Sequence, residues 1–157
     1  MADVLRSARP NPRPDATPPS RADAEPAARP PKPPFADRRI LVVDDEPDVL
    51  RVVAKRLERV GCEVGVAVDG EEALTLLLSD GPPWDLVLTD QTMPRRTGEQ
   101  LLLAMREAGV TTPVVVMSGY SATVTPERML AIGAAAFLPK PFDGTQLLAT
   151  VAAVIGR

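Results

Sequence analysis

The sequence predicts an α/β protein built on a doubly wound, five-stranded parallel sheet with five helices. Short apolar runs of strand length alternate five times with segments whose apolar residues recur at helical spacing. The runs are apolar throughout, which is typical of strands buried on both faces, and parallel sheets covered by crossover helices are built from such strands. We therefore expect helices on both sides of the sheet.

The first two strand and helix units follow a proline-rich segment. Residues 40–43 form the first apolar run, after which Pro47 fits the first turn of a helix that ends at Gly61. The apolar residues at helical spacing in this helix are Val49, Val52, Val53, Leu57 and Val60. Residues 64–68 form the second run, and Asp69 is a typical N-cap for the next helix.

The remaining three units continue the alternation. The third run ends on an acid, Asp90, and Thr125 followed by Pro126 marks the start of a helix. The expected strands are residues 86–89, 114–117 and 136–138, and the expected helices are residues 98–108, 125–132 and 145–155. With the first two units they complete five strands and five helices.

Residues 1–37 differ in composition from the rest of the chain. They are rich in Pro, Ala and Arg without apolar periodicity, so they cannot bury enough surface to offset the entropy of ordering the chain. We expect a disordered tail or linker here, and one folded domain over residues 38–157. The Pro-x-x-Pro pattern from Pro30 to Pro33 also fits a ligand for an SH3-like groove, but a linker explains the composition more simply.

Composition and charge argue against several classes of function. The formal charge of −3 comes without a basic stripe, so neither nucleic acid nor an anionic membrane is an expected partner. No apolar run approaches a membrane span and no secretory signal is evident, so we expect a cytoplasmic protein. The single cysteine, Cys62, predicts a buried core residue rather than a reactive thiol. The chain has no histidine, which excludes a phosphohistidine intermediate on the chain itself.

Polar side chains follow four of the five predicted strands. Asp44 and Asp45 follow the first strand, Asp90 the third, Ser118 the fourth and Lys140 the fifth. Each alone has an ordinary structural explanation, such as a helix cap, a turn residue or a solvated loop residue. In an open parallel sheet, however, the carboxyl ends of the strands meet at one edge, where ligands bind. We therefore expect these five side chains to form one site.

The residue types at this site are suited to phosphoryl chemistry. Three carboxylates that converge repel one another, so the site must take up protons or bind a hard cation such as Mg²⁺. Lys140 adds a positive charge suited to a phosphoryl oxygen, and Ser118 adds one hydroxyl donor. An aspartate nucleophile with a metal, a lysine and a hydroxyl is the minimal set for forming an acyl phosphate.

Four stretches of this sequence resemble the receiver domains of response regulators in two-component signalling. They are residues 42–47 (VVDDEP), 85–94 (DLVLTDQTMP) with Gly98 after them, 117–119 (MSG) and 137–142 (FLPKPF). Their order and spacing agree with the family, and the resemblance covers residues 38–157. It implies a flavodoxin-like fold of the receiver type, in agreement with the pattern of strands and helices.

The resemblance assigns roles to the residues at the strand ends. Asp90 would be the phosphoacceptor, and Ser118 and Lys140 would contact the bound phosphoryl group. The implied magnesium ligands are Asp44 (mainly through water), Asp45, Asp90 and the backbone carbonyl of Thr92. Phe137 matches the aromatic switch position that works with Ser118, although a plain core role explains it equally well. The Lys140–Pro141 bond is commonly cis in the family.

The function implied is that of a phosphoacceptor in a phosphorelay. A histidine kinase or a histidine phosphotransfer protein would donate the phosphoryl group, because the chain has no histidine of its own. The phosphorylated chain would then bind a downstream protein, or a second copy, through the helix of residues 125–132, the fifth strand and the last helix. We expect a stand-alone receiver with no enzymatic activity beyond its own phosphorylation and dephosphorylation.

Other classes of protein share parts of this residue pattern. A receiver derived from a hybrid histidine kinase is the nearest alternative, because the amino-acid sequence around Ser118 and Lys140 resembles that of such receivers. A magnesium-dependent phosphohydrolase of the haloacid dehalogenase class uses similar residues, but its nucleophile follows the first strand as Asp-x-Asp. A dinucleotide-binding domain lacks its glycine motif here, and a receiver that has lost phosphorylation would have replaced Asp90 or Lys140.

Overall fold

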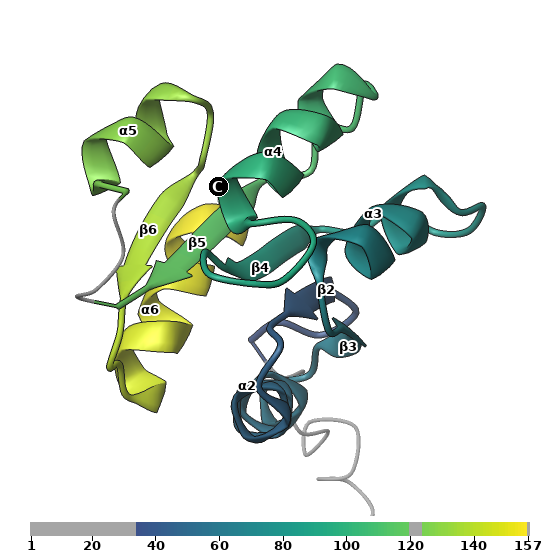
Figure 1. Ribbon diagram of the computed structural model, residues 1–157. Coiled ribbons are helices and arrows are strands. Elements are labelled where there is room, and N and C mark those ends of the chain that lie inside the picture. Colours follow the sequence, from purple (N-terminus) through teal and green to yellow (C-terminus); the bar gives the residue numbers. More distant parts are fainter. Residues whose placement is uncertain (1–33, 120–123, 157) are drawn as a thin grey trace, which may run out of the picture. The chain divides into compact units, whose positions relative to one another are not determined.

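The computed structural model describes residues 34–119 and 124–156, and most of the predicted tail therefore lies outside the described residues. Five strands and five helices alternate within these ranges (Figure 1). In chain order they are β2 (Arg39–Val43), α2 (Pro47–Arg59), β3 (Glu63–Ala67), α3 (Gly70–Leu78), β4 (Leu86–Asp90), α4 (Gly98–Glu107), β5 (Val114–Ser118), α5 (Pro126–Ala131), β6 (Ala136–Pro139) and α6 (Gly144–Ile155). Each lies within a few residues of its predicted position. None of these described helices has the length and apolar character to cross a membrane.

The five strands form one parallel sheet in the order β3-β2-β4-β5-β6, which confirms the predicted fold class. From β2 the chain crosses to β3 on one side, and the later strands extend the sheet on the other side, so the strand order reverses between β2 and β4. Val43 at the end of β2 lies opposite Ala67 of β3 and Thr89 of β4. The carboxyl ends of β2 and β4 therefore flank the point at which such sheets bind ligands.

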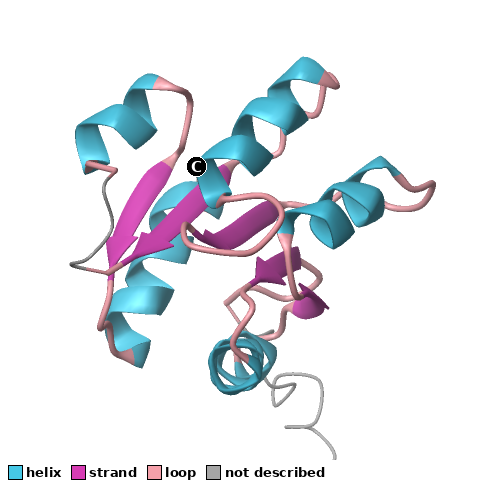
Figure 2. Ribbon diagram, viewed as in Figure 1, coloured by secondary structure: helices cyan, strands magenta, loops and turns pink. Residues whose placement is uncertain are grey.

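Helices cover both faces of the sheet (Figure 2). The fully buried side chains of β2 alternate between the faces, with Ile40 and Val42 in one apolar cluster and Leu41 and Val43 in the other. The first cluster is completed by residues of α2 and α6, and the second by residues of α3, α4 and α5. The sheet is thus doubly wound, and its central strands are rigidly held by packing on both sides.

The prediction that all five strands are buried on both faces is wrong for β3. Glu63 of this strand is exposed and Val66 is 47% exposed, whereas every residue of β4 and β5 is buried. The reason is topological, because β3 is at the edge of the sheet with β2 as its only neighbour. β6, at the opposite edge, is also only partly buried. The apolar composition of an edge strand therefore overstates its burial.

The buried face of α2 differs from the predicted one. The buried residues of this helix are Leu50, Val53 and Leu57. Val52, which belongs to the predicted apolar set, is 57% exposed. Leu50, Val53 and Leu57 follow an i, i+3, i+7 stripe, and Val52 falls beside it. The exposed Val52 lines a groove next to Lys140.

Ordered packing includes Phe35, three residues before the predicted domain start at Arg38. The Phe35 backbone N–H donates to the Val60 carbonyl at 3.0 Å, and its side chain packs against the apolar cluster that contains α2 and α6. The segment leading into β2 is thus attached to the end of α2.

Side chains cap several helices near the site, which fixes where each helix begins. Asp69 accepts from the Glu72 N–H at 2.8 Å and so caps α3, as predicted. Thr97 and Gln100 form a reciprocal capping box at the start of α4, and Asp143 with Gln146 does the same for α6. The loops that carry the site residues therefore end at defined positions.

Cys62 lies in the core, as predicted. It is buried in the cluster of α2 and α6, and burial, with a smaller contribution from the charge of Asp85, raises the pKa of its thiol to about 11. With that pKa, roughly one thiol in a thousand is ionised at pH 8, and only the thiolate is a strong nucleophile.

We expect iodoacetamide at pH 8 to alkylate Cys62 far more slowly in the folded chain than in the chain unfolded by guanidinium. Mass spectrometry of timed samples measures both rates. Equal rates in the folded and unfolded chain would show that the thiol is accessible and ionised, against its buried position.

Candidate functional site

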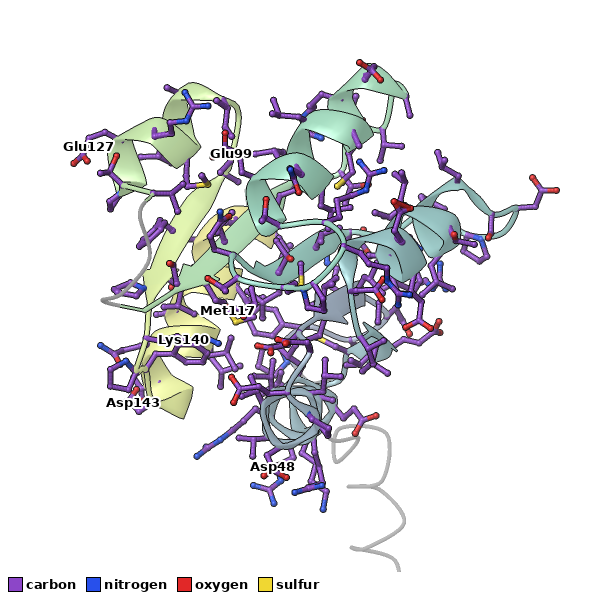
Figure 3. All side chains as sticks on the ribbon, viewed as in Figure 1. Asp48, Glu99, Met117, Glu127, Lys140 and Asp143 are labelled. Carbon is purple, nitrogen blue, oxygen red and sulfur yellow. The ribbon has the colours of Figure 1, made fainter. Side chains whose placement is uncertain are left out.

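The structure brings together the acids and the lysine that the sequence analysis placed at the strand ends. Asp44 and Asp45 follow β2, Asp90 ends β4, Ser118 ends β5 and Lys140 follows β6. The three aspartates each offer a carboxylate oxygen, and these oxygens lie within 4.8 Å of one another. In Figure 3, Met117 and Lys140 mark the ends of β5 and β6 at this edge of the sheet.

Lys140 bridges two of the three carboxylates. Its Nζ lies 3.1 Å from Asp90 Oδ1 and 3.2 Å from Asp44 Oδ2. Asp44 is fully buried, and its other oxygen accepts from the Glu46 N–H at 3.0 Å. One ammonium against three carboxylates leaves two negative charges when all four groups are ionised. The cluster therefore has the charge to bind a divalent cation.

The electrostatics of Asp90 and Lys140 are coupled. Burial and the nearby charge of Asp44 raise the pKa of Asp90, and the opposing effect of Lys140 does not cancel them. Burial alone would lower the pKa of Lys140, but the charges of Asp90 and Asp44 and their hydrogen bonds outweigh it, so the pKa of Lys140 is raised. Lys140 therefore stays positively charged at neutral pH. The ionised form of Asp90 is disfavoured by burial and by the neighbouring charge of Asp44.

Ser118 provides a polar atom without a partner. It is only 3% exposed, and its Oγ is one of two buried side-chain polar atoms without a hydrogen-bond partner in the described residues, the other being Arg96 Nε. A buried hydroxyl without a partner costs about 1 to 3 kcal/mol, so such a group calls for a partner such as a water, an ion or a bound ligand. An acceptor placed on Asp90 would satisfy it. The donor set and this orphaned hydroxyl fit Mg²⁺ together with a phosphoryl group.

Asp45 and Thr92 lie at the exposed rim of the site. Asp45 is exposed, in contrast to its buried neighbour Asp44, so its carboxylate can meet a hydrated cation without a desolvation cost. Thr92 is also exposed and follows Asp90 by two residues in the loop between β4 and α4. These positions are compatible with the implied magnesium ligands.

Two residues that the sequence analysis did not explain shape the loop after Asp90. Gln91 is buried, its carbonyl accepts from the Gly98 N–H at 3.0 Å, and its Oε1 accepts from the Glu99 N–H at 2.8 Å. A Cβ at Gly98 would lie 2.6 Å from the Asp90 carbonyl oxygen, so only glycine fits there. Both residues belong to the motif around Asp90, but no signal in the sequence indicated these structural roles.

Phe137 lies in β6 opposite Val116 of β5, two residues before the position opposite Ser118. Its side chain is partly buried and packs against the cluster that includes Met129 of α5. This contact is compatible with both the core role and the switch role. The Lys140–Pro141 peptide bond that follows is cis, as the resemblance implied.

A groove of about 570 Å³ opens beside Lys140, and the sequence analysis did not predict it. Its lining is mostly apolar and comes from α2 and from the loops after β5 and β6. The lining residues are Glu46, Asp48, Val49, Val52, Val53, Gly119, Lys140, Pro141 and Phe142. The groove leads directly to the residue that contacts Asp90.

Comparison with known proteins agrees with this geometry. Residues 40–152 match the model of the response regulator receiver domain family. The transcriptional regulatory proteins DltR of Streptococcus agalactiae and CpxR of Escherichia coli are 35% and 36% identical, covering 72% and 76% of this chain and 50% of each relative. The chain thus spans about half the length of the curated relatives it matches.

A solved structure shows the same fold. The receiver domain of the Francisella response regulator 1452 superposes with a TM-score of 0.70 at 30% identity, over 77% of this chain and 98% of that domain. Sequence, fold and the arrangement of acids at the strand ends therefore lead to one conclusion. The chain belongs to the response regulator receiver domain family of two-component signalling.

Proposed function

We propose that the chain accepts a phosphoryl group on Asp90 from a phosphohistidine of a partner protein, with Mg²⁺ held by Asp44, Asp45, Asp90 and the carbonyl of Thr92. Receiver domains generally bind Mg²⁺ and work with histidine kinases. The observation that supports the assignment most strongly is the buried, unpartnered hydroxyl of Ser118 at the same strand edge as Asp90. Within the described residues that hydroxyl has no hydrogen-bond partner, and a phosphoryl oxygen would give it one.

The residues of this chain divide the transfer among them. A carboxylate oxygen of Asp90 forms the new P–O bond as the P–N bond to the donor histidine breaks, and the electron pair of that bond stays on the imidazole. Lys140, 3.1 Å from Asp90 in the free chain, would then pair with one phosphoryl oxygen, and Ser118 would donate a hydrogen bond to another. Bound Mg²⁺ would supply the charge that offsets repulsion between the carboxylates and the incoming phosphoryl oxygens.

We further propose that this self-phosphorylation and the hydrolysis of the resulting acyl phosphate are the only reactions of the chain. Water attacking phosphorus breaks the bond to Asp90 and releases phosphate. The relatives named above are transcriptional regulatory proteins, which gives no support to descent from a hybrid histidine kinase. Because the chain spans half of those relatives, the absence of nucleic-acid contacts is a prediction for this chain alone.

Intact-mass measurement tests the proposal. The chain incubated with acetyl phosphate and Mg²⁺ should gain the mass of a single phosphoryl group, and chelation of Mg²⁺ should prevent the gain. An adduct that forms equally well in the presence of a chelator would contradict the metal-dependent reaction.

The groove beside Lys140 is the surface that a protein donor would use. A donor must bring its histidine to Asp90. Lys140, which contacts Asp90, also lines this apolar groove, so a protein bound in the groove lies next to Asp90. Val52 is 57% exposed on its wall, and a buried aliphatic contact of this kind stabilises complexes far more than a solvated one. Small phosphodonors need no such contact, so the two kinds of donor separate docking from chemistry.

We expect Val52→Asp to lower kcat/KM for a purified phosphohistidine donor by roughly tenfold, equal to about 1.4 kcal/mol, while acetyl phosphate reacts at the unchanged rate. A matched control is Leu103→Asp, which changes a 45% exposed residue of α4 outside the groove. If Val52→Asp and Leu103→Asp responded alike to the protein donor, the donor would bind elsewhere.

We propose that α5, β6 and α6 form the face whose surface changes when Asp90 is phosphorylated. Ser118 ends β5 beside β6, and Phe137 of β6 contacts the cluster that contains Met129 of α5. Leu130 of α5 is 51% exposed, so this face offers an apolar contact to a downstream protein or a second copy. A phosphoryl group that draws Ser118 inward would therefore shift the position of Phe137 and the surface next to it.

We expect Ser118→Ala to accept a phosphoryl group yet fail to change this face. Site-to-site couplings are typically about 1 to 3 kcal/mol, so one lost charge-assisted hydrogen bond is enough to remove the shift. Amide chemical shifts with and without beryllofluoride, which stands in for the phosphoryl group, report the change. Identical shifts over residues 124–155 in the wild type and Ser118→Ala would rule out the route through Ser118.

A further inference from the structure

The loop between β4 and α4 is fastened to α3 by two arginines. Arg95 Nη2 donates to Asp69 Oδ2, and Arg96 Nη2 donates to Glu71 Oε1 at 2.9 Å. The acceptors precede or lie in the first turn of α3, 25 and 26 residues earlier in the chain. The same loop contains Thr92, an implied magnesium ligand, so the two ion pairs act on a segment of the proposed site.

Asp69, the acceptor of the Arg95 ion pair, is held in a fixed position at the start of α3. Asp69 is 1% exposed, and one of its oxygens caps α3 by accepting from the Glu72 N–H at 2.8 Å. That hydrogen bond and the guanidinium of Arg95 lower the pKa of this carboxyl, so it is ionised at neutral pH. Removing Arg95 would leave this carboxylate with only the backbone groups of α3 as hydrogen-bond partners. The pair thus joins the exposed Arg95 to a carboxylate that the backbone at the start of α3 already holds in place.

The backbone of the loop is built for this close approach. Arg95 has φ of +67°, a left-handed conformation that is costly for a residue with a side chain. A Cβ at Gly70 would lie 2.6 Å from the Arg96 Cβ, so the loop touches the start of α3 where only glycine fits. A conformation of this kind persists when surrounding contacts hold it.

We propose that Arg95 is a positioning residue: by pairing with Asp69 it holds the loop between β4 and α4, and with it the carbonyl of Thr92, in the geometry that binds Mg²⁺. The inference rests on the proposed function. At its base the loop is held by Gln91, through its bonds with Gly98 and Glu99, and Arg95 holds the far side. Without Arg95, binding Mg²⁺ would also have to order the loop, which weakens affinity.

The full chain is titrated with MgCl₂ while amide chemical shifts of Asp45 and Gln91 report binding. We expect Arg95→Ala to bind Mg²⁺ roughly tenfold more weakly than the wild type, the lower end of the effect of groups that support metal ligands. Asp69→Asn keeps an N-cap side chain and should show the same loss. The double variant should lose no more than either single variant, because all three lack the same ion pair.

Arg39→Ala separates a loss of stability from a loss of positioning. Arg39 also bridges an acid, Glu63 at 2.7 Å, and it stacks 4.1 Å from the Trp84 ring, at the opposite end of the sheet from the site. This variant should melt at a lower temperature and bind Mg²⁺ with wild-type affinity. Arg95→Lys, which keeps the charge, should recover most of the affinity lost in Arg95→Ala.

The rate of reaction with acetyl phosphate gives a second readout. In Arg95→Ala the Mg²⁺ concentration for half-maximal rate should rise, while the rate at saturating Mg²⁺ should equal that of the wild type. Wild-type Mg²⁺ affinity in Arg95→Ala, or additive losses in the double variant, would overturn the role of the ion pair. A wild-type chain that binds no Mg²⁺ would instead overturn the proposed function on which this inference rests.

Discussion

Asp90→Asn should form no phosphoryl adduct with acetyl phosphate or with a protein donor. The loss should be complete rather than partial, because an amide oxygen is a poor nucleophile and neither neighbouring acid can replace Asp90. Asp44 is fully buried and already accepts from the Glu46 N–H and from Lys140. Asp45 is exposed, where water competes for an incoming phosphoryl group.

Intact-mass spectra of wild type and Asp90→Asn, collected under the same donor and Mg²⁺ concentrations, measure this effect. Asp45→Asn is the matched control, since it removes an acid of the same cluster without removing the proposed nucleophile. It should still form the adduct at a higher Mg²⁺ concentration. A persistent adduct in Asp90→Asn would move the phosphoacceptor to another residue.

Lys140→Met should produce the largest loss of stability among substitutions at the site. Lys140 is the cation that pairs with both buried carboxylates, and its side chain is only 22% exposed. Removing one partner of a buried ion pair costs about 3 to 5 kcal/mol, and partial exposure of Lys140 favours the lower end. Since about 1 kcal/mol shifts the melting temperature of a domain this size by roughly 2 to 8 °C, we expect a decrease on the order of 10 °C.

The pH dependence of this loss follows from the direction of the pKa shifts. The pKa of Lys140 is raised, so its stabilising charge is present at all pH values below the ordinary pKa of a lysine. The pKa of Asp90 is also raised, which means that the folded chain binds a proton there more readily than the unfolded chain. The cost of the Asp90 charge is therefore absent below the ordinary carboxyl pKa, grows as the pH rises from there toward the raised folded pKa, and is complete above it.

Thermal melts of Lys140→Met and wild type with a chelator present should thus differ most near pH 7 and less as the pH falls toward the range where the carboxylates protonate. Adding Mg²⁺ should restore part of the lost stability, because the cation replaces the missing positive charge. The double variant Lys140→Met/Asp90→Asn should melt above Lys140→Met. Melting temperatures that agree at pH 7 would show that Lys140 does not compensate the buried acids.

Most of the fold and the composition of the site could be predicted from sequence for a simple physical reason. The apolar runs ending at Asp44, Asp90 and Ser118 are long enough to be strands and have no polar face, so they indicate a parallel sheet. The carboxyl ends of parallel strands lie at one edge, so residues that follow different strands meet there. Lys140 and Asp44 are 96 residues apart and still make an ion pair.

The division of labour within the site could not be predicted in the same way. Asp44 and Asp45 are adjacent and chemically identical, yet one is fully buried against Lys140 and the other is exposed. Which of two neighbours faces inward depends on the path of the loop after β2. The ion pair of Arg95 with Asp69 likewise depends on how the loop after β4 meets α3, and no periodicity signals such a contact.

Two positional effects account for the remaining differences in burial: the place of a strand in the sheet and the side of a helix on which a residue lies. The composition of β3 predicts burial on both faces, but its place at the edge of the sheet leaves Val66 exposed. Val52 belongs to the apolar pattern of α2 yet lines the groove instead of the core. Apolar pattern therefore identified the elements, while strand order and helix rotation decided which apolar residues remain at the surface.

Locating the acyl phosphate chemically tests directly whether Asp90 is the phosphoacceptor. The chain would be treated with acetyl phosphate and Mg²⁺, reduced with borohydride, digested and mapped by peptide mass, since borohydride reduces an aspartyl phosphate to homoserine. If Asp90 is the phosphoacceptor, homoserine appears at position 90 and unreacted aspartate remains at positions 44 and 45. Homoserine at position 44 or 45, or at none of the three, would rule out Asp90 as the phosphoacceptor.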